Sequence, residues 1–199
     1  RSPIQPQAVQ ILTAEGNPAQ LQITSHWNGE DGKHLLTETT TVSIFANRLM
    51  IYDATLKAQA EPIEIEDTKE GMFAFRFRDE LREVAGASVS NANGLKTTKD
   101  CWGKESDWVD YHGTLEGKTY GVALFDHPMN FRRSRYHVRD YGLFAISPFG
   151  PHAYTNGALP KDPVHLPAGG FLRLRYGAYI HSGNTEEGKV RETYEQFLK

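Results

Sequence analysis

The sequence predicts an all-β fold, an antiparallel β-sandwich with one C-terminal helix. Short segments in which apolar and polar residues alternate follow one another along most of the 199-residue chain, with the two-residue period of half-buried strands. Clusters of Gly, Asn and Pro separate these segments, as turns separate strands. A helical period occurs only near the end of the chain. Ten to twelve strands with one helix indicate packed antiparallel sheets.

The first half of the chain supplies most of the predicted hairpins. Its β-type runs cover residues 9–13, 21–27, 35–46, 50–58, 63–66 and 73–78. Threonine-rich sequence in the third run favours a strand over a helix, and the break at Asn47-Arg48 makes the third and fourth runs a hairpin. Residues 79–85 are predicted to form a helical turn. Residues 88–99 are rich in Asn, Ser, Thr and Gly and are predicted to form a loop.

The second half continues the alternation and ends in the helix. Strands are predicted at 107–111, 119–125, 136–140 and 172–180, and the proline-rich stretch 148–167 is predicted to be mostly loop. Val190, Tyr194, Phe197 and Leu198 follow the i, i+4, i+7, i+8 spacing of an amphipathic helix, which we expect to pack on a sheet face or edge. No repeat, low-complexity tract or linker divides the chain, so we expect one domain over residues 1–199.

Composition limits the kinds of partner. The chain is 39% hydrophobic and 24% charged with a formal net charge of -3, and no basic run exceeds Arg132-Arg133. These values are ordinary for a soluble protein and give no reason to expect nucleic acid. No apolar stretch approaches the roughly 20 residues of a membrane span. The single cysteine, Cys101, cannot form an internal disulfide, so the compartment stays open, with a periplasmic or secreted parent protein as one expectation.

The stretch 121–150 holds the densest chemistry. A buried strand there stops at Asp126-His127-Pro128, and a second strand begins at Tyr136 and contains His137 and Asp140. Histidine titrates near neutrality and a carboxylate can orient it, so we predict His127 and His137 as acid/base groups with Asp126 or Asp140 beside them. The alternative for a histidine here is a hydrogen bond across a loop. A metal site of two histidines and one carboxylate is a further alternative, although the spacing fits no strong motif.

Other polar and aromatic residues are candidates for ligand binding. Arg139 can clamp a carboxylate or a hydroxyl-rich ligand, or it can pair with Asp140, Asp126 or Glu70. Trp102, Trp108 and Tyr111 can form an aromatic platform for a sugar ring, or they can pack in the core. The three arginines that precede the second strand are expected to form a solvated turn or to receive an anionic substrate such as a uronic acid; they are Arg132, Arg133 and Arg135.

Several of these segments resemble a family of bacterial proteins labelled "methane oxygenase PmoA-like". They are EDTKEG at 66–71, CWGK at 101–104, DWVDY at 107–111, FDHP at 125–128 and YHVRDYGLF at 136–144. The resemblance implies a sandwich of the galactose-mutarotase type, with a jelly roll as the alternative, and an association with saccharide breakdown. It also raises Lys69 and Glu70, otherwise expected in a turn, to candidates for substrate binding. The His-His-Arg segment found upstream in that family has no match before Ile4, so we expect either a shortened member of the family or a site that lacks one of its parts.

These observations lead to three functional hypotheses. The first is a carbohydrate-processing enzyme that uses general acid/base chemistry on a sugar or glycoside. Its catalytic residues would be His127, His137, Asp126 and Asp140, and its substrate-binding residues would be Arg139, Glu70, Lys69, Trp102, Trp108 and Tyr111. The second is a non-catalytic carbohydrate-binding module, and the third is a metal-dependent oxygenase of cupin-like or non-haem type. The sequence does not identify the substrate, a cofactor or the oligomeric state.

Overall fold

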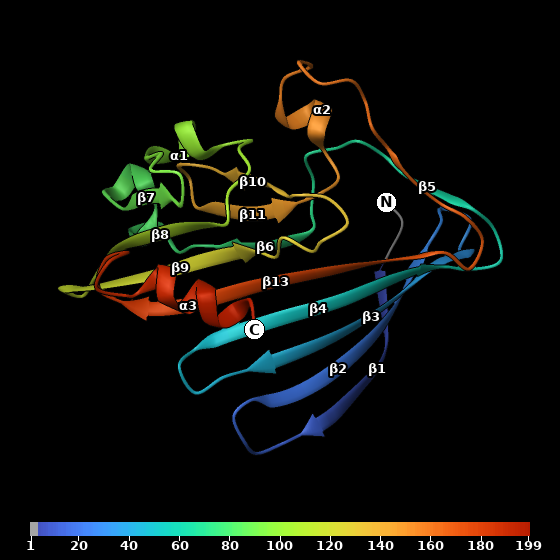
Figure 1. Ribbon diagram of the computed structural model, residues 1–199, viewed down its shortest axis with the longest axis horizontal. Coiled ribbons are helices and arrows are strands. Elements are labelled where there is room, and N and C mark those ends of the chain that lie inside the picture. Colours follow the sequence, from blue (N-terminus) through green and yellow to red (C-terminus); the bar gives the residue numbers. More distant parts are fainter. Residues whose placement is uncertain (1–3) are drawn as a thin grey trace.

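The computed structural model describes residues 4–199, and an eight-stranded antiparallel sheet is its largest element (Figure 1). Its strands, in spatial order, are β1 (Ile4–Thr13), β2 (Ala19–Asn28), β3 (His34–Ile44), β4 (Leu49–Ala58), β13 (Phe171–Ser182), β9 (Lys118–Asp126), β8 (Trp108–Leu115) and β7 (Ser88–Asn91). Strand β13 therefore lies between β4 and β9 and joins the first four strands to the rest.

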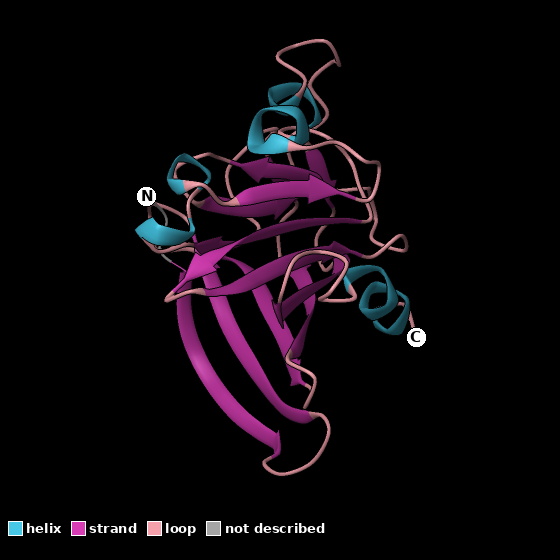
Figure 2. Ribbon diagram, turned by 90° about the vertical axis from the view of Figure 1, so that its left-hand side faces the viewer, coloured by secondary structure: helices cyan, strands magenta, loops and turns pink. Residues whose placement is uncertain are grey.

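A smaller sheet covers part of the large one. It consists of β10 (Arg135–Val138), β11 (Leu143–Ser147) and β6 (Phe73–Arg76), and a two-stranded ladder of β5 (Ile63–Ile65) and β12 (Val164–Leu166) lies apart from it. The main core fills the space between the two larger sheets, where alternate residues of β13, Leu172, Leu174 and Tyr176, meet Tyr136 and Phe144 of the small sheet. Strands β1 and β2 extend beyond this cover (Figures 1 and 2).

Three short α-helices lie on the outside of the two sheets. Helices α1 (Thr97–Cys101) and α2 (Pro151–Tyr154) lie beside the small sheet, whereas α3 (Val190–Phe197) packs on the face of the large sheet that is turned away from it (Figure 2). A second apolar cluster forms under α3, where Phe197 meets Phe125 of β9 at 5.6 Å between ring centroids. Two single-turn 3-10 helices span Asp79–Leu81 and Glu83–Ala85. Within residues 4–199 no helix is long and apolar enough to cross a membrane.

The all-β antiparallel sandwich and the C-terminal helix are confirmed. The predicted loop over 88–99 is wrong in part, because it contains β7 and α1. Val89 is buried there, and the side chain of Asn91 accepts the backbone N–H groups of Asn93 and Leu95, each at 3.0 Å. The polar composition of this segment predicted a loop, whereas β7 is stabilised as a strand by its pairing with β8. The stretch 148–167 is mostly loop, as predicted, and it also contains α2 and β12.

Removal of the Phe197 ring is expected to destabilise the protein by about 3–5 kcal/mol, because a buried Phe→Ala change leaves a cavity. Phe197 is fully buried against Phe125 and Tyr194. The measurement is urea unfolding of Phe197→Ala, with Leu198→Ala as the matched control. Leu198 is the next residue and is 40% exposed, so its loss should change the free energy of unfolding by about 0.5 kcal/mol or less. Equal effects of the two changes would contradict the placement of α3.

Candidate functional site

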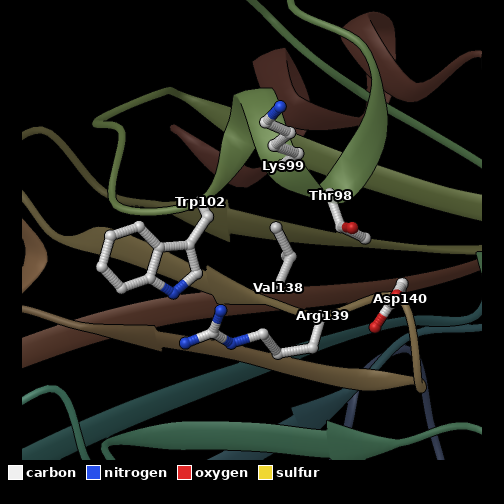
Figure 3. A pocket seen from close by; sticks show the side chains of 6 residues that line it. All are labelled: Thr98, Lys99, Trp102, Val138, Arg139 and Asp140. Atoms are coloured by element: carbon white, nitrogen blue, oxygen red, sulfur yellow. The ribbon is translucent and has the colours of Figure 1, made fainter.

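An open pocket lies where α1 meets the end of β10 (Figure 3). Its volume is about 270 Å³, slightly below the ~300–1,000 Å³ usual for drug-sized ligands, so one ring fits it. We call it the Arg139 pocket, and its lining residues are Thr98, Lys99, Trp102, Val138, Arg139 and Asp140. Three of these come from α1 and its C-terminal end, and three come from the β10–β11 hairpin.

The wall formed by α1 is held from two sides. The carboxylate of Glu83 accepts the backbone N–H of Thr98 at 2.9 Å and also the Thr98 hydroxyl, which ties the start of α1 to the preceding 3-10 turn. After Trp102 the chain turns through Gly103, which has a φ of 70° and donates its N–H to the carbonyl of Tyr136 at 2.8 Å. A Cβ at Gly103 would lie 2.4 Å from the carbonyl oxygen of Tyr154, so only glycine allows this approach.

His137 holds Arg139, a lining residue of the pocket, through a hydrogen bond. Its neighbour Tyr136 points into the main core, so His137 points to the outer face of the small sheet. Its Nε2 accepts a hydrogen bond from Nε of Arg139 at 3.2 Å, which leaves the proton on Nδ1, donated to the carbonyl of Lys69 at 3.1 Å. Burial lowers the pKa of His137, the bond to the Lys69 carbonyl opposes this, and the charge of Arg139 reinforces it. Both nitrogens of the neutral imidazole are therefore hydrogen-bonded, Nδ1 as a donor and Nε2 as an acceptor.

Arg139 is placed by the tight turn that follows β10. Its N–H donates to the carbonyl of Leu143 at 2.9 Å, and its carbonyl accepts the N–H of Gly142 at 3.0 Å. The guanidinium carbon lies 5.0 Å from the ring centre of Trp102, a cation–π contact. No carboxylate of residues 4–199 lies within 4.0 Å of the guanidinium. The ion pair considered for Arg139 from the sequence is therefore not formed.

The 66–71 segment reaches the site mainly through its backbone. The carbonyl of Lys69 accepts both the His137 bond and the hydroxyl of Tyr154, the latter at 2.8 Å. Asp67 instead caps α2, because its carboxylate accepts the N–H groups of His152 and Ala153. The side chains of Lys69 and Glu70 are exposed, and neither lines the Arg139 pocket.

The pair Asp126 and His127 lies elsewhere. His127 follows β9 and packs edge-on against Phe197 of α3 at 5.5 Å, and its Nδ1 accepts the N–H of Met129 at 3.2 Å. Burial lowers the pKa of His127. Asp126 is fully buried, and its carboxylate accepts the N–H of Ser134 at 3.1 Å. Burial raises its pKa, and the bond from Ser134 and the charge of Arg133 oppose this. The structure does not bring these two residues to His137.

Two of the three aromatic candidates pack inside the protein. Trp108 is 7% exposed and belongs to the cluster under α3, and Tyr111 is 2% exposed in the main core, where its hydroxyl accepts the N–H of Glu83 at 2.5 Å. Only Trp102 borders the pocket. The metal-ligand set of His127, His137 and a carboxylate does not assemble either. Across the described part of the chain, no three His, Cys, Asp or Glu side chains are placed to hold a metal ion.

The sequence prediction missed three residues of the site. Thr98 and Lys99 fell in the stretch predicted as a loop, and Tyr154 fell in the proline-rich stretch. Tyr154 contacts the rings of both Trp102 and His137, with centroids 5.9 and 6.0 Å away. The Cys-Trp-Gly-Lys segment was the one available signal, since it marked Trp102 without showing that a helix precedes it.

Comparison with known protein families places the chain in a family. A family model covers residues 2–195, nearly the whole chain, and it describes a family of unknown function, DUF6807. No curated protein matches the chain.

The neutral state of His137 can be measured directly. Since its pKa is lowered, we expect NMR titration to place it below the usual value of about 6.5, with the proton on Nδ1. As the pH falls through about 6.5, His137 becomes protonated in the unfolded chain but stays neutral in the native state, because its pKa is lower there. The contribution of His137 to the free energy of unfolding is therefore complete above that pH and decreases below it.

The matching variant is His137→Gln, which should flatten the loss of stability between about pH 7 and 5 relative to the wild type. A His137 pKa at or above 6.5, or a proton on Nε2, would contradict the hydrogen-bond arrangement.

Proposed function

Because the chain belongs to DUF6807, a family of unknown function, we propose its function from the geometry of the site: the protein binds a saccharide in the Arg139 pocket. The observation that carries this proposal is the Arg139 guanidinium, stacked on Trp102 in an open pocket without a carboxylate partner among residues 4–199. It offers fixed hydrogen-bond donors beside an indole ring.

The other lining groups fit a hydroxyl-rich ring. Asp140 is exposed at one side of the pocket and can accept hydroxyl protons, and Lys99 adds a donor on α1 (Figure 3). Sugars present both an apolar C–H face and a rim of hydroxyls, so they match a site that combines an aromatic ring with charged donors and acceptors. The resemblance of residues 66–144 to the PmoA-like family points in the same direction, since that family is associated with saccharide breakdown.

The geometry favours binding over turnover. A general acid or base needs a nitrogen or oxygen that is free to exchange a proton with the substrate, and both nitrogens of His137 are engaged. Glycoside hydrolysis usually needs two carboxyl groups on opposite sides of the bond, and Asp140 is the one carboxylate among the residues that line the pocket. His127 and Asp126 contact other elements. A non-catalytic carbohydrate-binding role therefore fits better than the acid/base enzyme.

Binding should depend on Trp102. We expect calorimetric titration with monosaccharides and their uronic acids to show saturable binding at millimolar concentration or below, and Trp102→Ala to weaken it at least about tenfold, because stacking area and the support of Arg139 are lost together.

The control is His127→Ala, a change of a part-buried aromatic residue on another face of the sandwich, which should leave the affinity unchanged. NMR spectra of the sugars after long incubation should show no product. An unchanged affinity in Trp102→Ala, or no saturable binding of any sugar, would overturn the proposal. Conversion of a sugar into a product would show that the protein is an enzyme and would overturn the proposal of a non-catalytic binding role.

A further inference from the structure

We propose that the saccharide of the Arg139 pocket carries a carboxylate, as a uronic acid does, and that Arg139 and the indole N–H of Trp102 hold this group together. This inference rests on the proposed function and narrows its ligand class. It is carried by two donors that lack an acceptor and by the charge of the pocket.

The first observation is the contrast between Arg139 and the arginines that precede it in the chain. Each of those arginines pairs with a carboxylate at 2.7–2.9 Å: Arg132 with Asp162, Arg133 with Asp107 and Arg135 with Glu105. Within residues 4–199, Arg139 makes one side-chain hydrogen bond, from Nε to the neutral ring of His137, and no ion pair. Its two terminal nitrogens keep their donors, in the fork that matches the two oxygens of a carboxylate.

The second observation is the indole nitrogen of Trp102. This atom is buried and has no hydrogen-bond partner. Of the four such side-chain atoms in residues 4–199, it is the one that belongs to a lining residue of the pocket. In Figure 3 it lies on the part of the indole nearer to the guanidinium of Arg139, which stacks on this ring. Two neighbouring N–H donors cannot satisfy one another, so each needs an acceptor, and an ionised carboxylate is acceptor-only at both oxygens.

Another indole N–H in this protein does have a carboxylate acceptor. The carboxylate of Glu38 accepts the indole N–H of Trp27 at 2.9 Å and the hydroxyl of Thr40 at 2.7 Å. An indole N–H therefore already donates to a carboxylate in this fold, whereas the indole N–H of Trp102, a residue that lines the pocket, has no acceptor among residues 4–199.

The third observation is charge. Lys99 and Arg139 give the lining two cations against one carboxylate, Asp140. Arg139 extends away from Asp140 toward Trp102, so the two signs lie at different ends of the pocket (Figure 3). A uronic acid matches this order, with its carboxylate at the Arg139 end and its hydroxyls within reach of Asp140. The reverse orientation would place two carboxylates together and is disfavoured.

The experiment compares each acid with its neutral parent by calorimetry: D-glucuronate against D-glucose, and D-galacturonate against D-galactose. At least one acid should bind about tenfold or more tightly than its parent, since charge-assisted hydrogen bonds are the stronger ones, and the preference should shrink as salt is raised. Arg139→Gln should remove the preference. Trp102→Phe keeps a ring but lacks the N–H, so it should weaken binding of the acid more than binding of the parent.

The matched control is Arg76→Gln. Arg76 also stacks on an aromatic ring, that of Tyr141 at 4.9 Å, and it lies on β6 of the same small sheet outside the pocket. This change should leave the preference intact. Urea unfolding of each variant establishes that it is folded, and Trp102→Phe keeps the inference testable where Arg139→Gln is unstable.

The outcomes separate the two proposals. Equal affinity for acid and parent, with both lost in Trp102→Ala, would overturn the carboxylate inference and leave saccharide binding in place. Binding of lactate, a hydroxy acid that is not a sugar, through Arg139 while no sugar binds would overturn the saccharide function and support carboxylate recognition. No binding of acid, parent or lactate would overturn both.

Discussion

Strand β13 is the constraint on which the rest of the structure depends. It pairs with β4 from Phe171 to Tyr179 and with β9 from Tyr176 to Ser182, so four residues near its centre are bonded on both sides. Gly177 sits in this doubly paired part, where a Cβ would lie 2.8 Å from the ring of Phe125. One face of β13 carries the main core and the other supports α3. The two halves of the large sheet, and both apolar clusters, therefore meet on a strand that is far from its partners in sequence.

Each of the two buried aspartates, Asp110 and Asp126, accepts hydrogen bonds from several donors. Asp110 lies between His181, at 2.8 Å, and His112, at 3.1 Å, and it also accepts the hydroxyl of Thr185. Burial alone would raise the pKa of Asp110, but these three bonds outweigh it and lower the pKa. Asp126 has a comparable set of donors, including the backbone of Ser134. Unmatched polar groups are costly in such an interior, which makes the unmatched donors of the Arg139 pocket informative.

The sequence predicted the strands well because their signal is local. The alternation of Leu172 and Leu174 with Arg173 marked β13, and the spacing of Val190, Tyr194 and Phe197 marked α3. The site was predicted less well because it depends on contacts between distant segments. His137 and Arg139 were identified, but His127, close to them in sequence, belongs to another face. A period of two places side chains on faces of one strand and does not show which strand ends meet in space.

The same contacts are the basis on which we propose recognition, in place of proton transfer, for this site. The backbone N–H of Arg139 is bonded to the carbonyl of Leu143, its Nε is bonded to His137, and its guanidinium stacks on the ring of Trp102. The side chain therefore has little conformational entropy left to lose when a ligand binds. His137 provides this rigidity only while Nε2 accepts and Nδ1 donates. A histidine that exchanged protons with a substrate would have to break one of these bonds and release the guanidinium. The arrangement that orders Arg139 is therefore the one in which His137 stays neutral, and our proposal of saccharide binding rests on this arrangement.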